Sequence, residues 1–265
     1  MPISLETRVT IDKRIIGERN TVAVLTFLYR FGWLTSRMLS ILVWPTAKQA
    51  PAMARRAVRG LVDDKLILRR SLPEGGDCYV LSATGARFLN DATGLAATSG
   101  ASLPLGNPTH RACANWFLVG HINDGNAVWT EHEIQTGRAP LVAVDGKVPD
   151  GLVELPEGML WVEVENAWKN RKERAKVVAF CRRQLLPGFQ LAELAPGRYL
   201  RRVVIVGTTG EALRAMVRSF ADAHETARLS ESQAADIELV LLPVDKNLVA
   251  GPTVTGSLWW DGLAP

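Results

Sequence analysis

The chain has 265 residues, of which 47% are hydrophobic and 22% are charged, so it can bury one large core or two modest ones. It has no apolar run of about 18 residues and no apolar segment between Met1 and Lys13, so we expect a soluble, cytoplasmic protein without a membrane partner. The three cysteines are scattered and the four histidines lack zinc-site spacing, which argues against a disulfide framework and a zinc centre.

The formal net charge of +4 is distributed unevenly along the chain. Residues 1–92 hold 14 Lys and Arg against 8 Asp and Glu, whereas residues 93–265 hold 17 against 19. Excess positive charge favours association with a polyanion. The basic N-terminal third is therefore the part expected to meet nucleic acid.

The N-terminal third has the apolar periodicity of three helices. The first is expected over residues 14–31, where Gly32 can end it. The second is expected to begin after Thr35, a preferred N-cap residue, and to end near Val43. The third is expected over residues 49–64. Its predicted core face consists of Met53, Ala57, Val58, Leu61 and Val62.

Two apolar stretches, residues 66–70 and 78–81, flank a Gly-rich turn and predict a two-stranded ribbon. Three helices and a ribbon are the order of a winged helix-turn-helix domain, which we assign to residues 1–92. Its third helix can enter the major groove of DNA while the ribbon contacts the backbone. The residues expected to meet double-stranded DNA are Lys48, Arg55, Arg56, Arg59, Arg69 and Arg70. Alternatively, these cations form the solvated face of a winged helix that binds protein.

Residues 93–108 are small, uncharged and rich in Gly, Ser and Pro, which predicts a linker to a second domain over residues 109–265. Helical periodicity is found there at residues 110–122, 167–186 and 211–225. Strand patterns lie at residues 127–134, 152–155, 161–165, 202–206 and 237–242. Strands that alternate with helices imply a mixed sheet flanked by helices, so the chain as a whole is expected to be α/β (α+β).

The most informative segment is the hairpin that Asp150 precedes and that Glu163 and Glu165 end. Val162 and Val164 alternate with the two glutamates, so the glutamates share one face of their strand. Three crowded carboxylates repel one another, and a divalent cation such as Mg or Mn relieves that repulsion. The segment therefore predicts a metal site, although two acids at alternate positions can also mark the solvent side of a strand.

Further residues could complete such a site. Glu131, in the expected strand 127–134, is either an additional metal ligand or an exposed strand acid. Lys176, or Lys172 or Lys169 by helical proximity, could bring an ammonium over the acids and stabilise negative charge that develops on a phosphate. His110 is either a catalytic base or an ordinary residue at the start of its helix.

A helix, a hairpin with Asp150 and the pair Glu163 and Glu165 resemble the core of the PD-(D/E)XK nucleases, although Glu165 stands where that family usually has lysine. With the winged helix added, residues 15–210 are similar to the replication-relaxation family of plasmid and mobile-element proteins and to the related MobC class of relaxases. The positions that match that pattern are His110, Asp150, Glu163, Glu165, Lys176 and Phe180.

The resemblance implies a Mg- or Mn-dependent DNA nickase or relaxase that acts in mobilisation or replication. It also implies double-stranded DNA and other mobilisation or replication proteins as partners. A non-catalytic DNA-binding regulator or accessory protein on a degenerate nuclease fold is the alternative. The missing lysine and the acidic balance of residues 93–265 favour that alternative. A winged helix that binds only protein is a third possibility.

Overall fold

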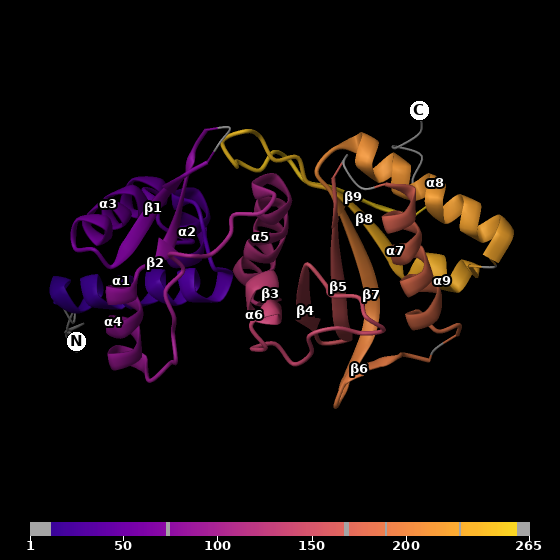
Figure 1. The fold of residues 1–265 in the computed structure, drawn as a ribbon, viewed down its shortest axis with the longest axis horizontal. Helices are drawn as coiled ribbons and strands as arrows, with labels where there is room; N and C mark the ends of the chain where they lie inside the picture. Colours follow the sequence, from indigo (N-terminus) through magenta and orange to yellow (C-terminus); the bar gives the residue numbers. More distant parts are fainter. Residues whose placement is uncertain (1–11, 73–74, 167–169, 189, 228, 259–265) are drawn as a thin grey trace, which may run out of the picture.

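The computed structural model describes residues 12–72, 75–166, 170–188, 190–227 (backbone only for 223–227) and 229–258. Two units lie side by side along the long axis of the molecule (Figure 1). The first combines helices with a small ribbon, and the second has a mixed sheet with helices on both faces. The mixed α/β class predicted from the sequence is thus confirmed. Within the described ranges, no helix is long and apolar enough to cross a membrane.

The elements of the first unit are α1 (Lys13–Phe31), α2 (Ser36–Val43), α3 (Ala50–Asp63), β1 (Ile67–Ser71), β2 (Asp77–Leu81) and α4 (Ala83–Thr93). The side chain of Thr35 caps α2, as predicted, by accepting a hydrogen bond from the Met38 N–H. Gly32 ends α1 at a φ of 76°, in a region that strains residues with a side chain. Helix α4 was absent from the sequence prediction, although Ser82 caps it in the same way as Thr35 caps α2.

The predicted core face of α3 is partly wrong. Ala54, Val58 and Leu61 are the buried residues of this helix, whereas Met53 is 36% exposed. The buried residues follow one another at intervals of four and three, the spacing of a single helical stripe. The buried stripe begins at Ala54, whose side chain is small, and not at Met53. The predicted core face was thus offset from the observed one by about one residue at this end.

The second unit contains α5 (Pro108–Asn123), β3 (Ala127–Thr130), α6 (Glu131–Gln135), β4 (Gly151–Leu155), β5 (Gly158–Glu165), α7 (Arg171–Gln184), β6 (Glu193–Ala195), β7 (Arg198–Gly207), α8 (Gly210–Ala227), α9 (Glu231–Ala235), β8 (Ile237–Leu241) and β9 (Val254–Ser257). In the described part of the chain the strands are ordered β3-β4-β5-β7-β8-β9, with β6 paired to β7. Strands β3, β4 and β5 are antiparallel, β5, β7 and β8 are parallel, and β9 is antiparallel to β8.

Both faces of this sheet are buried, so its central strands alternate between two cores. Val162 and Val164 belong to the core on the α5 side, whereas Trp161 belongs to the core beneath α7 and α8. Figure 1 shows α5 on one face, between the sheet and the first unit, and α7 and α8 on the other.

The strand predicted at residues 127–134 is only half correct. It ends at Thr130, and Glu131 and Glu133 belong to helix α6. Thr130 and Glu133 form a capping box, in which the Thr130 side chain accepts from the Glu133 N–H and the Glu133 carboxylate accepts from the Thr130 N–H. This reciprocal pair starts a helix and overrides the alternating pattern of the segment.

The predicted linker is held against the first unit. Ala97 is 6% exposed, and its backbone is hydrogen-bonded through N–H and C=O to the side chain of Asn90. Gly100 donates its N–H to the Leu81 carbonyl at 2.8 Å. A single apolar cluster contains Leu28 of α1 and Val162 of β5, so the two units share a core.

Candidate functional site

Asp150, Glu163 and Glu165 lie at one end of the sheet, where β4 begins and β5 ends. We call these three residues the acid edge. The Asp150 N–H donates to the Val162 carbonyl at 2.9 Å, which continues the β4–β5 pairing past the first residue of β4. The Asp150 carboxylate also accepts a 2.7 Å bond from the Val164 N–H. The register therefore makes Asp150 and Glu163 neighbours on adjacent strands.

The two glutamates are buried rather than solvated. Glu163 and Glu165 are each 1% exposed, which contradicts the alternative that they mark the solvent side of β5. The alternation with Val162 and Val164 holds, but both faces of the strand are covered. Carboxylates are almost never fully buried without a partner, so this burial requires compensating donors or cations.

His110, at the start of α5, comes next to the acid edge. Its Nε2 lies 3.4 Å from the Asp150 Oδ2, and both side chains are nearly one-fifth exposed. The N-cap residue Asn107 begins α5 by accepting from the His110 N–H, which fixes where the imidazole projects. The His110 imidazole therefore contacts one residue of the acid edge.

Glu163 is compensated from both sides. Its Oε1 accepts a 2.6 Å bond from the Trp161 Nε1, and its Oε2 lies 2.7 Å from the Lys147 ammonium. Lys147 is a partner of the site that was not predicted from the sequence. The available signal was the Asp-Gly dipeptide before it, which favours a tight turn that can return the chain toward the sheet.

The acid edge offers the oxygen ligands that Mg and Mn prefer. Within the described ranges, however, no three His, Cys, Asp or Glu side chains converge in an arrangement that holds a metal ion as they stand. The carboxylate oxygens are thus the type of ligand that Mg and Mn require. In this structure, however, the Glu163 carboxylate contacts Trp161 and Lys147.

Two of the three predicted lysines, Lys172 and Lys176, belong to the described part of α7. Lys172 is exposed, and the Lys176 ammonium is bonded to Glu173 of its own helix at 2.8 and 3.0 Å. That contact lowers the pKa of Glu173. Lys169 lies outside the described residues.

Glu131 has a different partner. Its Oε2 is 3.7 Å from the Nε of Arg111, whose side chain is 8% exposed. Burial lowers the pKa of Arg111, and the charge of Glu131 opposes that effect. Glu131 is therefore the counter-ion of a buried arginine, a role that the strand prediction could not show because it placed this residue outside α6.

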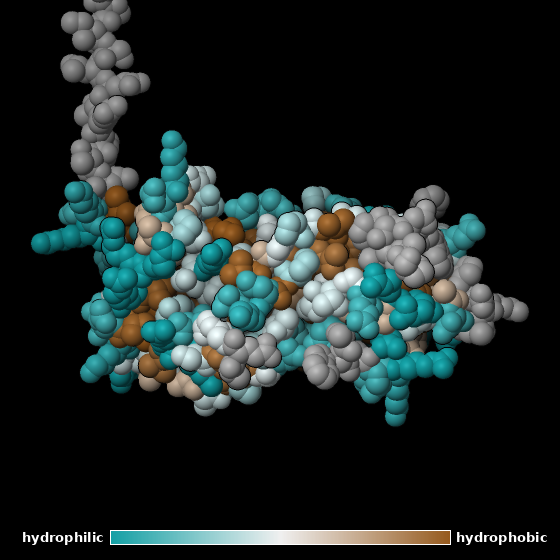
Figure 2. Space-filling view, turned by 90° about the horizontal axis from the view of Figure 1, so that it is seen from above, coloured by the Kyte–Doolittle hydropathy of each residue, from teal (hydrophilic) through white to brown (hydrophobic). Residues whose placement is uncertain are grey.

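The first unit presents the predicted cations of α3, and Lys48 just before that helix, at its surface. Lys48, Arg55, Arg56 and Arg59 are all exposed. Arg55 and Arg59, one turn apart, line a groove between α3 and the β1–β2 ribbon that also contains Arg69. Arg56 instead lines the opposite flank of α3, which faces α1. Figure 2, with the first unit at the left, shows hydrophilic side chains around this end with apolar patches between them.

The two ribbon arginines differ. Arg69 is 61% exposed and its guanidinium lies 2.6 Å from Asp77 on the paired strand, a contact that raises the pKa of Arg69. Arg70 donates to the carbonyl of Leu103, in the connecting segment. The structure thus brings Arg69 to the groove and gives Arg70 a partner inside the protein.

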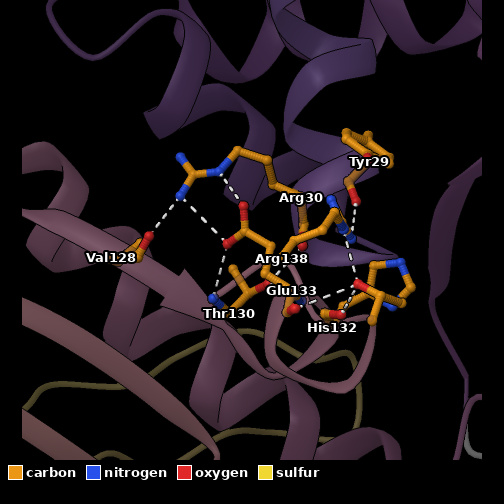
Figure 3. A network of polar contacts seen from close by, with 8 residues as sticks. Tyr29, Arg30, Val128, Thr130, His132, Glu133 and Arg138 are labelled. Carbon is orange, nitrogen blue, oxygen red and sulfur yellow. Dashed lines mark hydrogen bonds and ion pairs between the residues drawn. The ribbon is translucent and has the colours of Figure 1, made fainter. Parts of the chain in front are cut away.

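A polar network joins α1 to α6 (Figure 3). The Arg30 Nε lies 2.8 Å from the Glu133 carboxylate, and an Arg30 terminal nitrogen donates to the Val128 carbonyl at 2.7 Å. Arg138 donates to the carbonyl of Tyr29 at 3.1 Å and covers its ring at 4.0 Å. We call this set of contacts the α1–α6 junction.

Comparisons of the chain with known protein families, with curated proteins and with solved structures found no match.

Proposed function

We propose that this protein binds double-stranded DNA through the groove between α3 and the β1–β2 ribbon. The observation that carries the proposal is the placement of Arg55, Arg59 and Arg69 around one groove on the basic unit. Arginine presents several N–H donors, which suit phosphate oxygens and guanine edges. Three helices followed by a ribbon also support a winged helix-turn-helix arrangement, in which the third helix reads the groove and the ribbon meets the backbone.

The test is a binding measurement on the full chain with a library of duplexes over a range of salt. Changing Arg55 and Arg59 together to Ala should lower affinity at least about tenfold and flatten its salt dependence. The control changes Arg14 and Arg19, two exposed arginines of α1, and removes the same charge outside the groove. Equal losses in the two double variants would show that charge alone acts, and salt-insensitive association would favour a protein partner.

A second candidate function is metal-dependent cleavage of one DNA strand. With the short elements α6 and β6 set aside, the order α5, β3, β4, β5, α7, β7 resembles the PD-(D/E)XK core, with three antiparallel strands and then a parallel one. Asp150, Glu163 and Glu165 lie at the end of the β4–β5 hairpin, where the resemblance predicts the acids. These features support a nickase or relaxase of the replication-relaxation type, working with other mobilisation or replication proteins.

In this function the three carboxylates would hold Mg or Mn, which when bound supplies a Lewis acid for a phosphate oxygen. Asp150 would be oriented by the Val164 N–H, and His110 would exchange a proton at its Nε2. The opposing hypothesis, a DNA-binding regulator that does not cleave, is favoured by one observation: both oxygens of Glu163 already accept from Trp161 and Lys147.

The experiment incubates supercoiled plasmid with the full chain, with and without Mn. If the protein cleaves one strand, relaxed plasmid should form only when Mn is present. Asp150→Asn or Glu165→Gln should abolish its formation. Glu157→Gln, at the exposed turn between β4 and β5, is the matched control and should cleave as the wild type does. If the protein binds the plasmid and the plasmid stays supercoiled, the result would support the alternative function, a DNA-binding regulator that does not cleave.

A further inference from the structure

Lys147 is presented to the sheet by a built turn. The backbones of Val144 and Lys147 exchange two hydrogen bonds of 2.9 Å, and the two residues between them have φ of 51° and 75°. Positive φ at both central positions is the geometry of a type I′ turn. The first of them, Asp145, accepts from Arg183 and Gln184 of α7 at 3.1 and 2.8 Å, so the turn is fastened to that helix.

The ion pair between Lys147 of this turn and Glu163 is largely buried. The side chain of Glu163 is 2% exposed and that of Lys147 is 18% exposed. Cys181 of α7 is fully buried beside this pair, and burial is the main reason why the pKa of its thiol is raised. In such surroundings a carboxylate without a counter-ion lowers the stability of the folded protein. Removing one member of a buried ion pair therefore destabilises the fold more than replacing both members with uncharged residues.

Trp161 and Lys147, which both contact the Glu163 carboxylate, differ in how freely they can move. Trp161 is fully buried and stacks against Phe180 with ring centroids 4.3 Å apart. Lys147 sits on a turn with part of its side chain in solvent. A lysine side chain has several rotatable bonds, so its ammonium can move to water without any change in the sheet.

We propose that Lys147 is a resident cation of the acid edge. It holds the Glu163 carboxylate in place when no metal ion is bound, and a divalent cation reaches Glu163 only by displacing the Lys147 ammonium. Lys147 is therefore a positioning residue that sets the metal affinity of the site. The displacement step rests on the proposed metal-dependent cleavage, but the pairing of Lys147 with Glu163 does not.

Thermal unfolding of the full chain, with chelator and with Mn, tests this competition. In chelator, Lys147→Met should melt roughly 10 °C below wild type, because the buried Glu163 carboxylate loses its ion pair with the Lys147 ammonium. Adding Glu163→Gln to that variant should recover most of the loss. Mn should then raise the midpoint of Lys147→Met more than that of wild type. Lys147→Gln, which keeps a donor amide, replaces Lys147→Met if the latter does not fold.

Arg182→Met is the control, since it removes one exposed positive charge from α7. Its response to Mn should equal that of wild type. Equal, non-zero Mn shifts in wild type and Lys147→Met would overturn displacement while leaving metal binding intact. A midpoint that ignores Mn in both proteins would overturn displacement together with the metal-dependent function. A Lys147→Met variant that melts like wild type in chelator would overturn the resident-cation role itself.

Discussion

Buried charge at single residues distinguishes the acid edge from an ordinary sheet end. Glu163 and Glu165 are each almost completely buried. Glutamate is rarely found buried and is depleted in β-strands, so both positions are unusual for this residue. The Val164 N–H, Trp161 and Lys147 supply donors to this group of acids. Partners of this kind, drawn from separate segments, hold polar groups in fixed orientations, as a binding or catalytic site requires.

His132 gives a residue-level prediction about pH. Burial, together with the charges of Arg111 and Arg138, lowers its pKa to about 4. The unfolded chain binds a proton at an ordinary histidine pKa near 6.5, so it takes up protons before the folded protein does. Stability should therefore fall as the pH drops from about 6.5 to about 4. Burial also lowers the pKa of His121, which adds to the same loss.

The measurement is the free energy of unfolding in urea at pH 7.5, 6, 5 and 4 for wild type and His132→Asn. The variant should lose less stability between about pH 6.5 and 4, because the titrating group is gone. Acids titrate equally in both proteins, so the difference between the two curves isolates His132. Parallel curves would show that His132 is protonated as readily in the folded protein as in the unfolded chain.

At the level of elements, local signals in the sequence predicted most helix and strand positions. Thr35 and Gly32 mark helix ends by chemistry that acts within a few residues, and the β4–β5 hairpin follows from its own alternation. The segment after Thr130 was misassigned because alternation was given more weight than the Thr130–Glu133 capping box. The sequence contained both the alternating pattern and the capping-box residues, and the structure follows the capping box.

The partners of the site residues could not be predicted in the same way. Lys147 meets Glu163, and Arg111 meets Glu131, through tertiary contacts that no local spacing encodes. The hairpin register, a local feature, is what places the Asp150 backbone opposite the end of β5. Sequence patterns thus located the acids, whereas the cations that compensate them depend on how α5 and the Lys147 turn pack.

The α1–α6 junction yields a prediction at this scale. Arg30→Met removes the ion pair with Glu133 and leaves a carboxylate that is 9% exposed without its cation. Because the capping box still supplies one donor to Glu133, the expected loss of unfolding free energy is about 2 kcal/mol, below that of a fully orphaned charge. Urea denaturation measures it. Arg37→Met, at an exposed position on α2, should change stability by less than about 0.5 kcal/mol.

The whole molecule joins its two units through one apolar cluster and the α1–α6 junction. Leu28 and Phe31 of α1 lie in the same cluster as Val128 of β3 and Leu118 of α5. A continuous core makes the groove of α3 and the acid edge parts of one body. DNA held in that groove would therefore meet the second unit in a fixed orientation, which is why the binding and cleavage experiments use the full chain.

Gly32 lies where the two units meet, and it tests their cooperativity. Its φ is 76°, and an added Cβ would come within 2.9 to 3.0 Å of Arg111, Leu103 and His132. Gly32→Ala should cost roughly 1–3 kcal/mol of backbone strain. Since the core is shared, calorimetry should show one unfolding transition in wild type and one transition at a lower temperature in the variant. A second transition in Gly32→Ala, with one unit melting at the wild-type temperature, would show instead that the units fold independently and that the contacts between them add little stability.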